Sequence, residues 1–132
     1  MEPYIDVPHY LNELSRSVIG AAIEVHSVLG RGFLESLYEM AMVEELHARN
    51  IQFERQVPMP VLYRGRIIGE HRLDLLVGGE LVVELKAVTA IAEAHVAQTL
   101  SYLKAGAFLL GLILNFNVRV MRDGVRRVVS SG

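Results

Sequence analysis

The stretch 72–86 limits the chain to a small number of folds. Its sequence is Arg-Leu-Asp-Leu-Leu-Val-Gly-Gly-Glu-Leu-Val-Val-Glu-Leu-Lys. Side chains alternate between the two faces of a strand, so this pattern predicts two strands that turn at Gly78-Gly79. The even positions include Asp74, Glu84 and Lys86. The odd positions form one wholly apolar face, made of Leu73, Leu75, Val77, Leu81, Val83 and Leu85.

The same alternation fixes the register of this hairpin. A two-residue turn at Gly78-Gly79 would set the apolar face of one strand beside the charged face of the other. A three-residue loop, Gly78-Gly79-Glu80, pairs Val77 with Leu81 and keeps the apolar faces together, and a glycine supplies the positive φ that such loops need. Asp74 then lies directly across from Glu84, with Lys86 two residues further along.

Two facing carboxylates on neighbouring strands repel each other and need a compensating feature. Either one of them is protonated, or a cation lies between them. Mg²⁺ prefers oxygen ligands and keeps several waters, which leaves room for a phosphate. Asp74, Glu84 and Lys86 together are suited to metal-assisted phosphodiester hydrolysis. The alternative is a surface strand whose charged face meets solvent.

The remaining pattern predicts a single domain spanning residues 1–132, with a mixed α/β sheet and helices packed against it. Helices are expected at 8–29, 34–49 and 91–105, the second with Leu34, Leu37, Tyr38, Ala41 and Leu46 facing inward. Strands are expected at 51–57, 60–63, 66–71 leading into the central hairpin, and 108–116. A terminal hairpin is expected from 118–121 and 125–129. Pro58 and Pro60 indicate a bend or an edge strand.

His95, Gln98 and Tyr102 share one face of the third expected helix, because they are spaced by three and four residues. This polar stripe could line a phosphate site, and a solvated face is the alternative. Likewise, Arg55, Arg64, Arg66 and Arg72 could form a phosphate-contacting rim, or could simply be solvated. The spacing of His9, His26, His47 and His71 does not suit metal ligands, so we expect these histidines to be structural or exposed.

The composition sets outer limits on function. The formal net charge of −2 argues against binding DNA by bulk electrostatics alone, although a metal ion and local arginines could supply positive charge. The absence of cysteine excludes disulfides and thiol catalysis and fits a cytoplasmic location. The most apolar run, 108–116, is too short to span a bilayer, so no membrane association is expected. A homodimer is possible, but no residue pattern requires it.

Several motifs in the chain resemble those of the GxxExxY protein family. They include Gly32-Phe33-Leu34-Glu35-Ser36-Leu37-Tyr38 and Val83-Glu84-Leu85-Lys86-Ala87-Val88. Glu54-Arg55-Gln56-Val57-Pro58 and Asn115-Phe116 fit as well. That family is similar to the PD-(D/E)xK nuclease superfamily, so the resemblance implies a restriction-endonuclease-like fold.

The resemblance also implies roles for single residues. Asp74 would be the motif aspartate, Glu84 and Lys86 the ExK pair, and Gln98 and Tyr102 a catalytic Gln-x-x-x-Tyr pair. The metal, Mg²⁺ or Mn²⁺, would be held by Glu35, Asp74, Glu84 and the Leu85 carbonyl. For Glu35 the alternative is a carboxylate stabilised by the helix dipole. Independently of the resemblance, we expect the substrate contacts to be His95, Gln98, Tyr102, Arg55 and Arg72. For His95 the alternative is a supporting role through a hydrogen bond.

Two functions are therefore expected from the sequence. The first is a Mg²⁺-dependent nuclease acting on nucleic acid, with DNA favoured over RNA. The second is a non-catalytic module that binds nucleic acid or protein and has kept the nuclease fold. Tyr38 is expected in the core with its hydroxyl hydrogen-bonded rather than in catalysis.

Overall fold

A five-stranded sheet in the order β1-β2-β3-β4-β5 forms the centre of the computed structural model, which describes residues 7–131. The elements are α1 (His9–Leu29), α2 (Glu35–Ala48), β1 (Phe53–Tyr63), β2 (Arg66–Val77), β3 (Leu81–Lys86), α3 (Glu93–Gly106), β4 (Leu110–Asn115), a short 3-10 helix η1 (Met121–Gly124) and β5 (Val125–Val129). Only β3 and β4 pair in parallel, and α3 connects them. The expected mixed sheet flanked by helices is confirmed.

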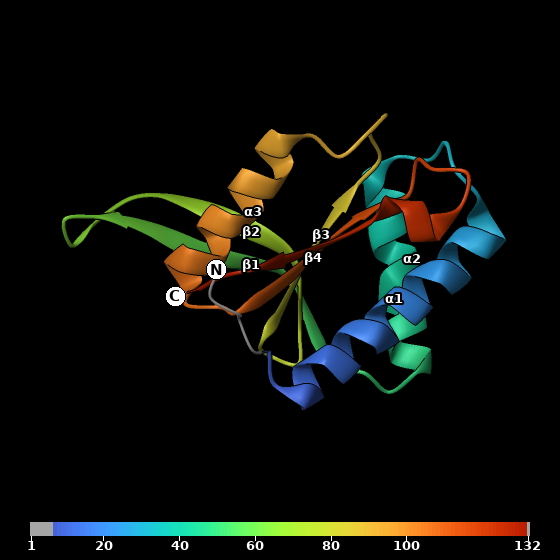
Figure 1. Cartoon of the computed structure of the whole chain (residues 1–132), viewed down its shortest axis with the longest axis horizontal. Helices are drawn as coiled ribbons and strands as arrows, with labels where there is room; N and C mark the ends of the chain where they lie inside the picture. Colours follow the sequence, from blue (N-terminus) through green and yellow to red (C-terminus); the bar gives the residue numbers. More distant parts are fainter. Residues whose placement is uncertain (1–6, 132) are drawn as a thin grey trace, which may run out of the picture.

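The helices cover both faces of the sheet (Figure 1). Helices α1 and α2 pack on one face, where Val18, Tyr38 and Leu46 join the apolar side chains of β3 and β4 in the larger core. Helix α3 packs on the other face, where Leu103 meets Val82 of β3 in a smaller core. The part of the chain from 7 to 131 contains no helix that is long and apolar enough to cross a membrane.

The β2–β3 hairpin has the register that the sequence predicts. Val77 pairs with Leu81 and Leu75 with Val83 across the loop 78–80. Gly78 and Gly79 both have positive φ, 60° and 72°. Glycine adopts this left-handed conformation at no steric cost, which is why the loop can close without strain. If this pairing is extended by one residue beyond Leu75 and Val83, Asp74 lies opposite Glu84.

The prediction of one wholly apolar face along β2 is wrong at Leu73. Leu75 and Val77 pack in the core beneath α1 and α2, whereas Leu73 packs with Leu76 in the core beneath α3. The alternation of side chains therefore inverts beside Asp74. At this point the β1–β2 pairing skips Asp74 and its neighbour Gln56, whose φ is 51°. A non-glycine residue in this region of φ is uncommon and bends the strand locally.

Strand β1 is one continuous edge strand rather than two short ones. Pro58 and Pro60 lie within it, which an edge strand tolerates because one side of its backbone needs no partner. β1 and β2 continue far beyond the rest of the sheet as a two-stranded ribbon, visible as the long projection in Figure 1. The ribbon ends in the predicted turn Arg64-Gly65, where both residues have positive φ.

The inner face of α2 differs from the prediction. Tyr38 and Leu46 are buried as expected, but Leu34 and Leu37 are 74% and 50% exposed. Glu39 and Met42 take the inner positions instead. Glu39 can be buried because Arg55 and Gln56 of β1 satisfy its carboxylate, a tertiary contact that local periodicity does not reveal.

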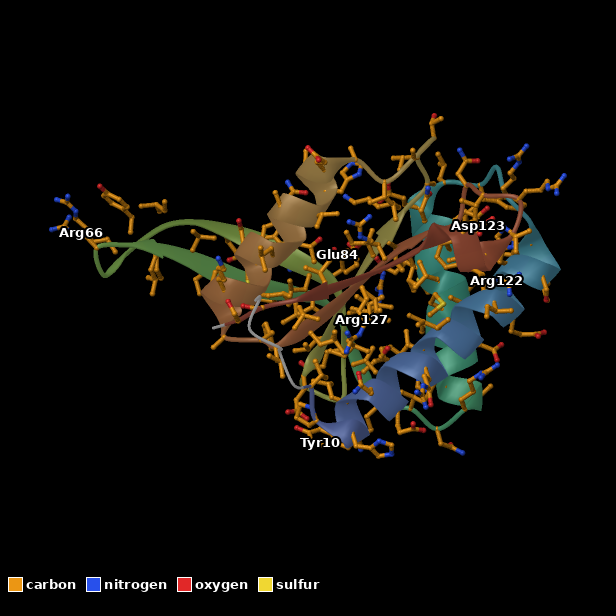
Figure 2. All side chains as sticks on the ribbon, in the orientation of Figure 1. Tyr10, Arg66, Glu84, Arg122, Asp123 and Arg127 are labelled. Carbon is orange, nitrogen blue, oxygen red and sulfur yellow. The ribbon has the colours of Figure 1, made fainter. Side chains whose placement is uncertain are left out.

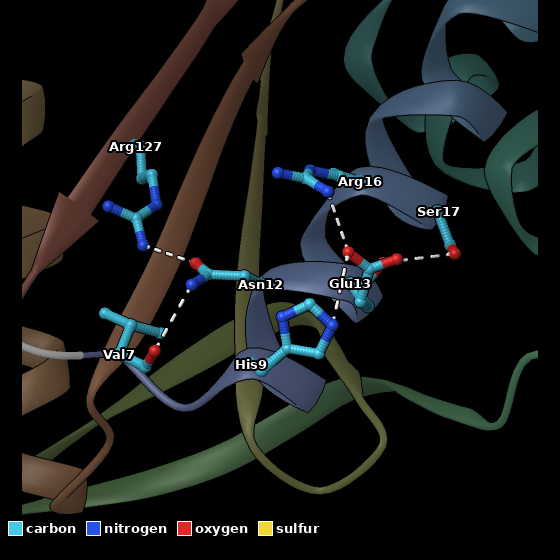
Figure 3. A network of polar contacts seen from close by, with 7 residues as sticks. All are labelled: Val7, His9, Asn12, Glu13, Arg16, Ser17 and Arg127. Carbon is cyan, nitrogen blue, oxygen red and sulfur yellow. Dashed lines mark hydrogen bonds and ion pairs between the residues drawn. The ribbon is translucent and has the colours of Figure 1, made fainter.

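The expected terminal hairpin is also wrong in its first half. Residues 118–120 form bends and 121–124 the 3-10 helix, so β5 pairs with β4 instead. β5 is tied to the start of α1, because Arg127 donates to Asn12 Oδ1 at 2.6 Å while Asn12 Nδ2 donates to the Val7 carbonyl (Figure 3). Arg127 is thus engaged in holding the fold.

Candidate active site

Asp74 and Glu84 lie together on the α3 side of the sheet, where β2 and β3 begin to diverge. The Leu85 N–H donates to Asp74 Oδ2 at 2.8 Å, so the Asp74 carboxylate replaces a ladder partner of β3. Glu84 is 6% exposed and shares a hydrogen bond with Asp74. Figure 2 places Glu84 in the middle of the molecule, between α3 and the sheet. The side chains of Asp74 and Glu84 therefore converge, as the register of the hairpin predicts.

The electrostatics of this pair follow from its burial. Loss of solvent, followed by the neighbouring Asp74 carboxylate, raises the pKa of Glu84 to about 9, although Lys86 opposes the shift. Glu84 is therefore protonated at neutral pH and shares its proton with Asp74. Protonation of Glu84 is one of the two arrangements that relieve the repulsion between facing carboxylates.

His71 is the residue of this site that sequence reasoning missed. Its Nε2 lies 3.1 Å from Glu84 Oε1, and its ring stacks on Tyr102 with centroids 3.5 Å apart. Burial lowers the pKa of His71, an effect that Asp74 partly offsets, so the ring is neutral beside a neutral Glu84. The contact is then a hydrogen bond between two neutral groups, and the tautomer of the His71 ring decides which of them donates. Strict alternation would have placed His71 on the face opposite Asp74, and only the inversion beside Asp74 brings both to one side.

Tyr102 and Gln98 complete the α3 side of the site. Burial and then the nearby Glu84 raise the pKa of the Tyr102 hydroxyl, while its hydrogen bond with Gln98 opposes this shift. Gln98 and Tyr102 thus share one face of α3, as expected. Tyr102 stacks on the His71 ring, which in turn contacts Glu84. The signal available in the sequence was the spacing of four residues on one helix.

Lys86 ends β3 on the same side as Glu84, two residues further along. Its charge lowers the pKa of both Glu84 and His71, which shows that the ammonium group lies near them. Within the described residues, Lys86 makes no hydrogen bond or ion pair through its side chain. The amine is available to a ligand.

Asn115, at the end of β4, positions the loop that follows Lys86. It is 1% exposed, its Oδ1 accepts the Val88 N–H at 3.0 Å, and its Nδ2 donates to the Val88 carbonyl at 2.9 Å. The Lys86 carbonyl in turn accepts the Phe116 N–H. These bonds fix the backbone on which Lys86 sits.

Glu35 is not drawn into the pair. It is exposed at the first position of α2, on the opposite layer. Across residues 7–131, no three acidic, histidine or cysteine side chains assemble into a group that could hold a metal ion. The ligand role of Glu35 stays a prediction, as does that of the Leu85 carbonyl. Tyr38 of the same motif is structural as expected: its hydroxyl donates to the Gly30 carbonyl at 2.6 Å and its ring stacks on Phe116.

The other predicted substrate contacts are engaged in the fold to different degrees. Arg55 donates from Nη2 to Glu39 Oε2 at 2.6 Å. His95 Nδ1 accepts a hydrogen bond from the Ala92 N–H, so this side chain supports the start of α3. Arg72 donates to the Gln56 carbonyl but remains exposed.

Comparison with known proteins gives one match: the sequence model of the PD-(D/E)XK nuclease superfamily matches residues 12–128. The chain belongs to the PD-(D/E)XK nuclease superfamily. The restriction-endonuclease-like fold class is thereby confirmed, whereas the narrower GxxExxY assignment stays a resemblance. No curated protein and no solved structure matches the chain.

In this PD-(D/E)XK protein, the assignment of Asp74 to the motif aspartate and of Glu84-Leu85-Lys86 to the (D/E)XK stays a prediction. Leu73, the residue before Asp74, lies buried beneath α3. The match covers every residue of the site described above, from His71 to Asn115.

Proposed function

We propose that this PD-(D/E)XK protein is a nuclease that hydrolyses phosphodiester bonds and uses Mg²⁺ or Mn²⁺ bound to Asp74 and Glu84. The observation that carries the proposal is the placement of two carboxyl groups, Asp74 held by the Leu85 N–H and Glu84 buried beside it, next to Lys86. A buried acid with a pKa near 9 is costly to a fold that has no use for it.

The donor set fits such an ion. Mg²⁺ in nucleases and related enzymes is typically held by one or two carboxylates, with waters and phosphate oxygens completing its shell. Asp74 and Glu84 supply two carboxylates, and the Leu85 N–H holds one oxygen of Asp74 in place. When bound, a divalent ion activates water and stabilises negative charge on the phosphate.

The protein's own groups supply the remaining functions. The Lys86 ammonium lies where it can orient the attacking water or stabilise charge on the phosphate. His71 holds Glu84 by its hydrogen bond and is itself held by the Tyr102 ring. Gln98 orients the Tyr102 hydroxyl, and both present polar groups that can position the nucleic acid.

Cleavage assays test the proposal. Single-stranded, double-stranded and branched DNA, and RNA, are incubated with the purified protein in Mg²⁺, in Mn²⁺ and in EDTA. We expect metal-dependent cleavage that Lys86→Ala and Asp74→Asn abolish. Cleavage of none of these substrates, or equal cleavage by Lys86→Ala, would refute the proposal.

A specific observation supports the second candidate, a non-catalytic binding module. Glu84 already has hydrogen-bond partners in Asp74 and His71, and residues 7–131 hold no three-residue metal group. Binding of nucleic acid by both wild type and Asp74→Asn, without cleavage in any metal, would favour it.

A further inference from the structure

The β1–β2 ribbon projects from the body of the protein with unusual side chains at its tip. Leu62, Tyr63, Ile67 and Ile68 are 60%, 58%, 68% and 66% exposed. Residues 60–69 carry two arginines and no acid, so this tip has a formal charge of +2 in a chain of −2. An exposed cluster of this kind marks an interaction site rather than an ordinary surface.

The two arginines are free to meet an anion. Neither Arg64 nor Arg66 pairs with a carboxylate in the part of the chain that the structure describes. The Arg64 guanidinium lies 5.4 Å from the centre of the Tyr63 ring, and the Arg66 side chain extends from the ribbon tip away from the body (Figure 2). The positive charge of the tip therefore complements phosphate.

The ribbon also has the right orientation relative to the active site. Met59 of β1 packs on the α3 side of the sheet, and alternation along β1 puts Tyr63 on that same side. His71 pairs with Met59 and Arg66 with Tyr63, and between these pairs a bulge adds one residue to β2 and leaves β1 continuous. One face of the ribbon thus leads from the tip to the acids.

We propose that the β1–β2 ribbon is an arm that binds double-stranded DNA by entering its major groove. That groove admits a two-stranded β-ribbon, whereas the major groove of an RNA duplex is too narrow and deep. Arg64 and Arg66 contact phosphates, and the exposed apolar side chains contact base edges such as the thymine methyl group. This inference rests on the proposed nuclease function and narrows its substrate to duplex DNA.

The length of the arm sets its reach. Arg66 and Asp74 are eight residues apart on β2, which corresponds to about 26 Å of extended strand. At roughly 3.4 Å per base pair, the arm contacts the duplex about eight base pairs from the scissile phosphate.

The test compares the full-length wild type with Arg64→Glu/Arg66→Glu and with Arg119→Glu/Arg122→Glu. The second pair is matched in charge and exposed, and Arg122 lies at the far end of the molecule from Arg66 (Figure 2). Binding to a DNA duplex of about 30 base pairs, long enough to reach past the arm, is followed by fluorescence anisotropy in EDTA. Cleavage then plays no part, so failure of the arm and failure of the nuclease are distinguishable.

We expect Arg64→Glu/Arg66→Glu to weaken duplex binding about tenfold or more relative to the matched pair. The slope of log K against log salt should fall by about two, one for each lost phosphate contact. The preference for duplex over single strand should fall as well, and Tyr63→Ala should weaken binding without changing the slope.

Three results would refute the proposal that the β1–β2 ribbon binds duplex DNA. They are equal binding by the two charge-reversed proteins, no duplex binding by wild type, and a loss of self-association in Arg64→Glu/Arg66→Glu, seen by sedimentation, with unchanged affinity for DNA. The last result would mean that a second copy of the chain occupies the tip. Duplex binding that depends on the arm, without cleavage in any metal, would support the arm and refute the nuclease.

Discussion

His71 Nε2 lies 3.1 Å from Glu84 Oε1, and this contact joins two groups that are both uncharged at neutral pH. The pair is therefore a neutral hydrogen bond and not a salt bridge. It gives the buried Glu84 acid a hydrogen-bond partner, which a buried polar group requires.

Glu84→Gln should make the protein more stable at alkaline pH. The unfolded chain loses the Glu84 proton near pH 4.5, whereas the folded protein holds it to about 9. Between these values the folded state binds more protons, so the Glu84 contribution to the free energy of unfolding falls as pH rises. Urea denaturation from pH 5 to 9 should show a falling curve for wild type relative to Glu84→Gln. Glu93→Gln, an exposed acid on α3, is the control; a parallel curve for Glu84→Gln would contradict the prediction.

Binding of Mn²⁺ at neutral pH should release about one proton, because Glu84 must ionise to become a ligand. Calorimetric titration in two buffers of different ionisation enthalpy measures this number. Affinity should rise as pH is raised toward 9 and should fall at least tenfold in Asp74→Asn. Binding without proton release would show that the ion does not bind Glu84.

Lys86→Ala should lower the cleavage rate by about 10²–10³-fold, the usual effect of removing one group that stabilises transition-state charge. The side chain makes no ion pair within residues 7–131, so the thermal midpoint should barely change. Lys104→Ala, an exposed lysine in the last turn of α3, serves as the matched control. Equal rates for both variants would remove Lys86 from the mechanism.

His71→Phe should separate the hydrogen bond of His71 from its stacking. The ring can still stack on Tyr102, but Glu84 loses a buried partner, which should cost about 1–3 kcal/mol in unfolding free energy. Tyr102→Phe keeps the stacked ring and should change stability by less than about 0.5 kcal/mol. Denaturant unfolding measures both, and a loss below about 0.5 kcal/mol in His71→Phe as well would argue that stacking alone holds the ring at position 71.

Arg55 and Glu39 should be coupled in stability. The carboxylate of Glu39 is buried, whereas the Arg55 side chain is 47% exposed, so removing Arg55 leaves a buried charge with fewer donors. A double-mutant cycle with Arg55→Ala and Glu39→Ala should give a coupling energy of about 1–3 kcal/mol. A coupling near zero, with Arg55→Ala reducing only nucleic-acid binding, would favour the predicted substrate contact instead.

The sequence by itself determined the β2–β3 hairpin and the meeting of Asp74 with Glu84. The period of two along a strand allows only one loop length that keeps both apolar faces together, so the register is a local property. The helices expected at 8–29 and 91–105, which correspond to α1 and α3, could be predicted because helical periodicity is local as well.

The tertiary structure alone decided that His71 joins the site and that Leu34 and Leu37 stay outside the core. His71 reaches Glu84 because the strand alternation inverts beside Asp74, where Gln56 adopts a positive φ and donates a hydrogen bond to Glu39. Buried Glu39 likewise displaces the apolar residues expected on the inner face of α2. Contacts between residues far apart in the chain outweigh local periodicity at these positions, and no pattern within a single segment records them.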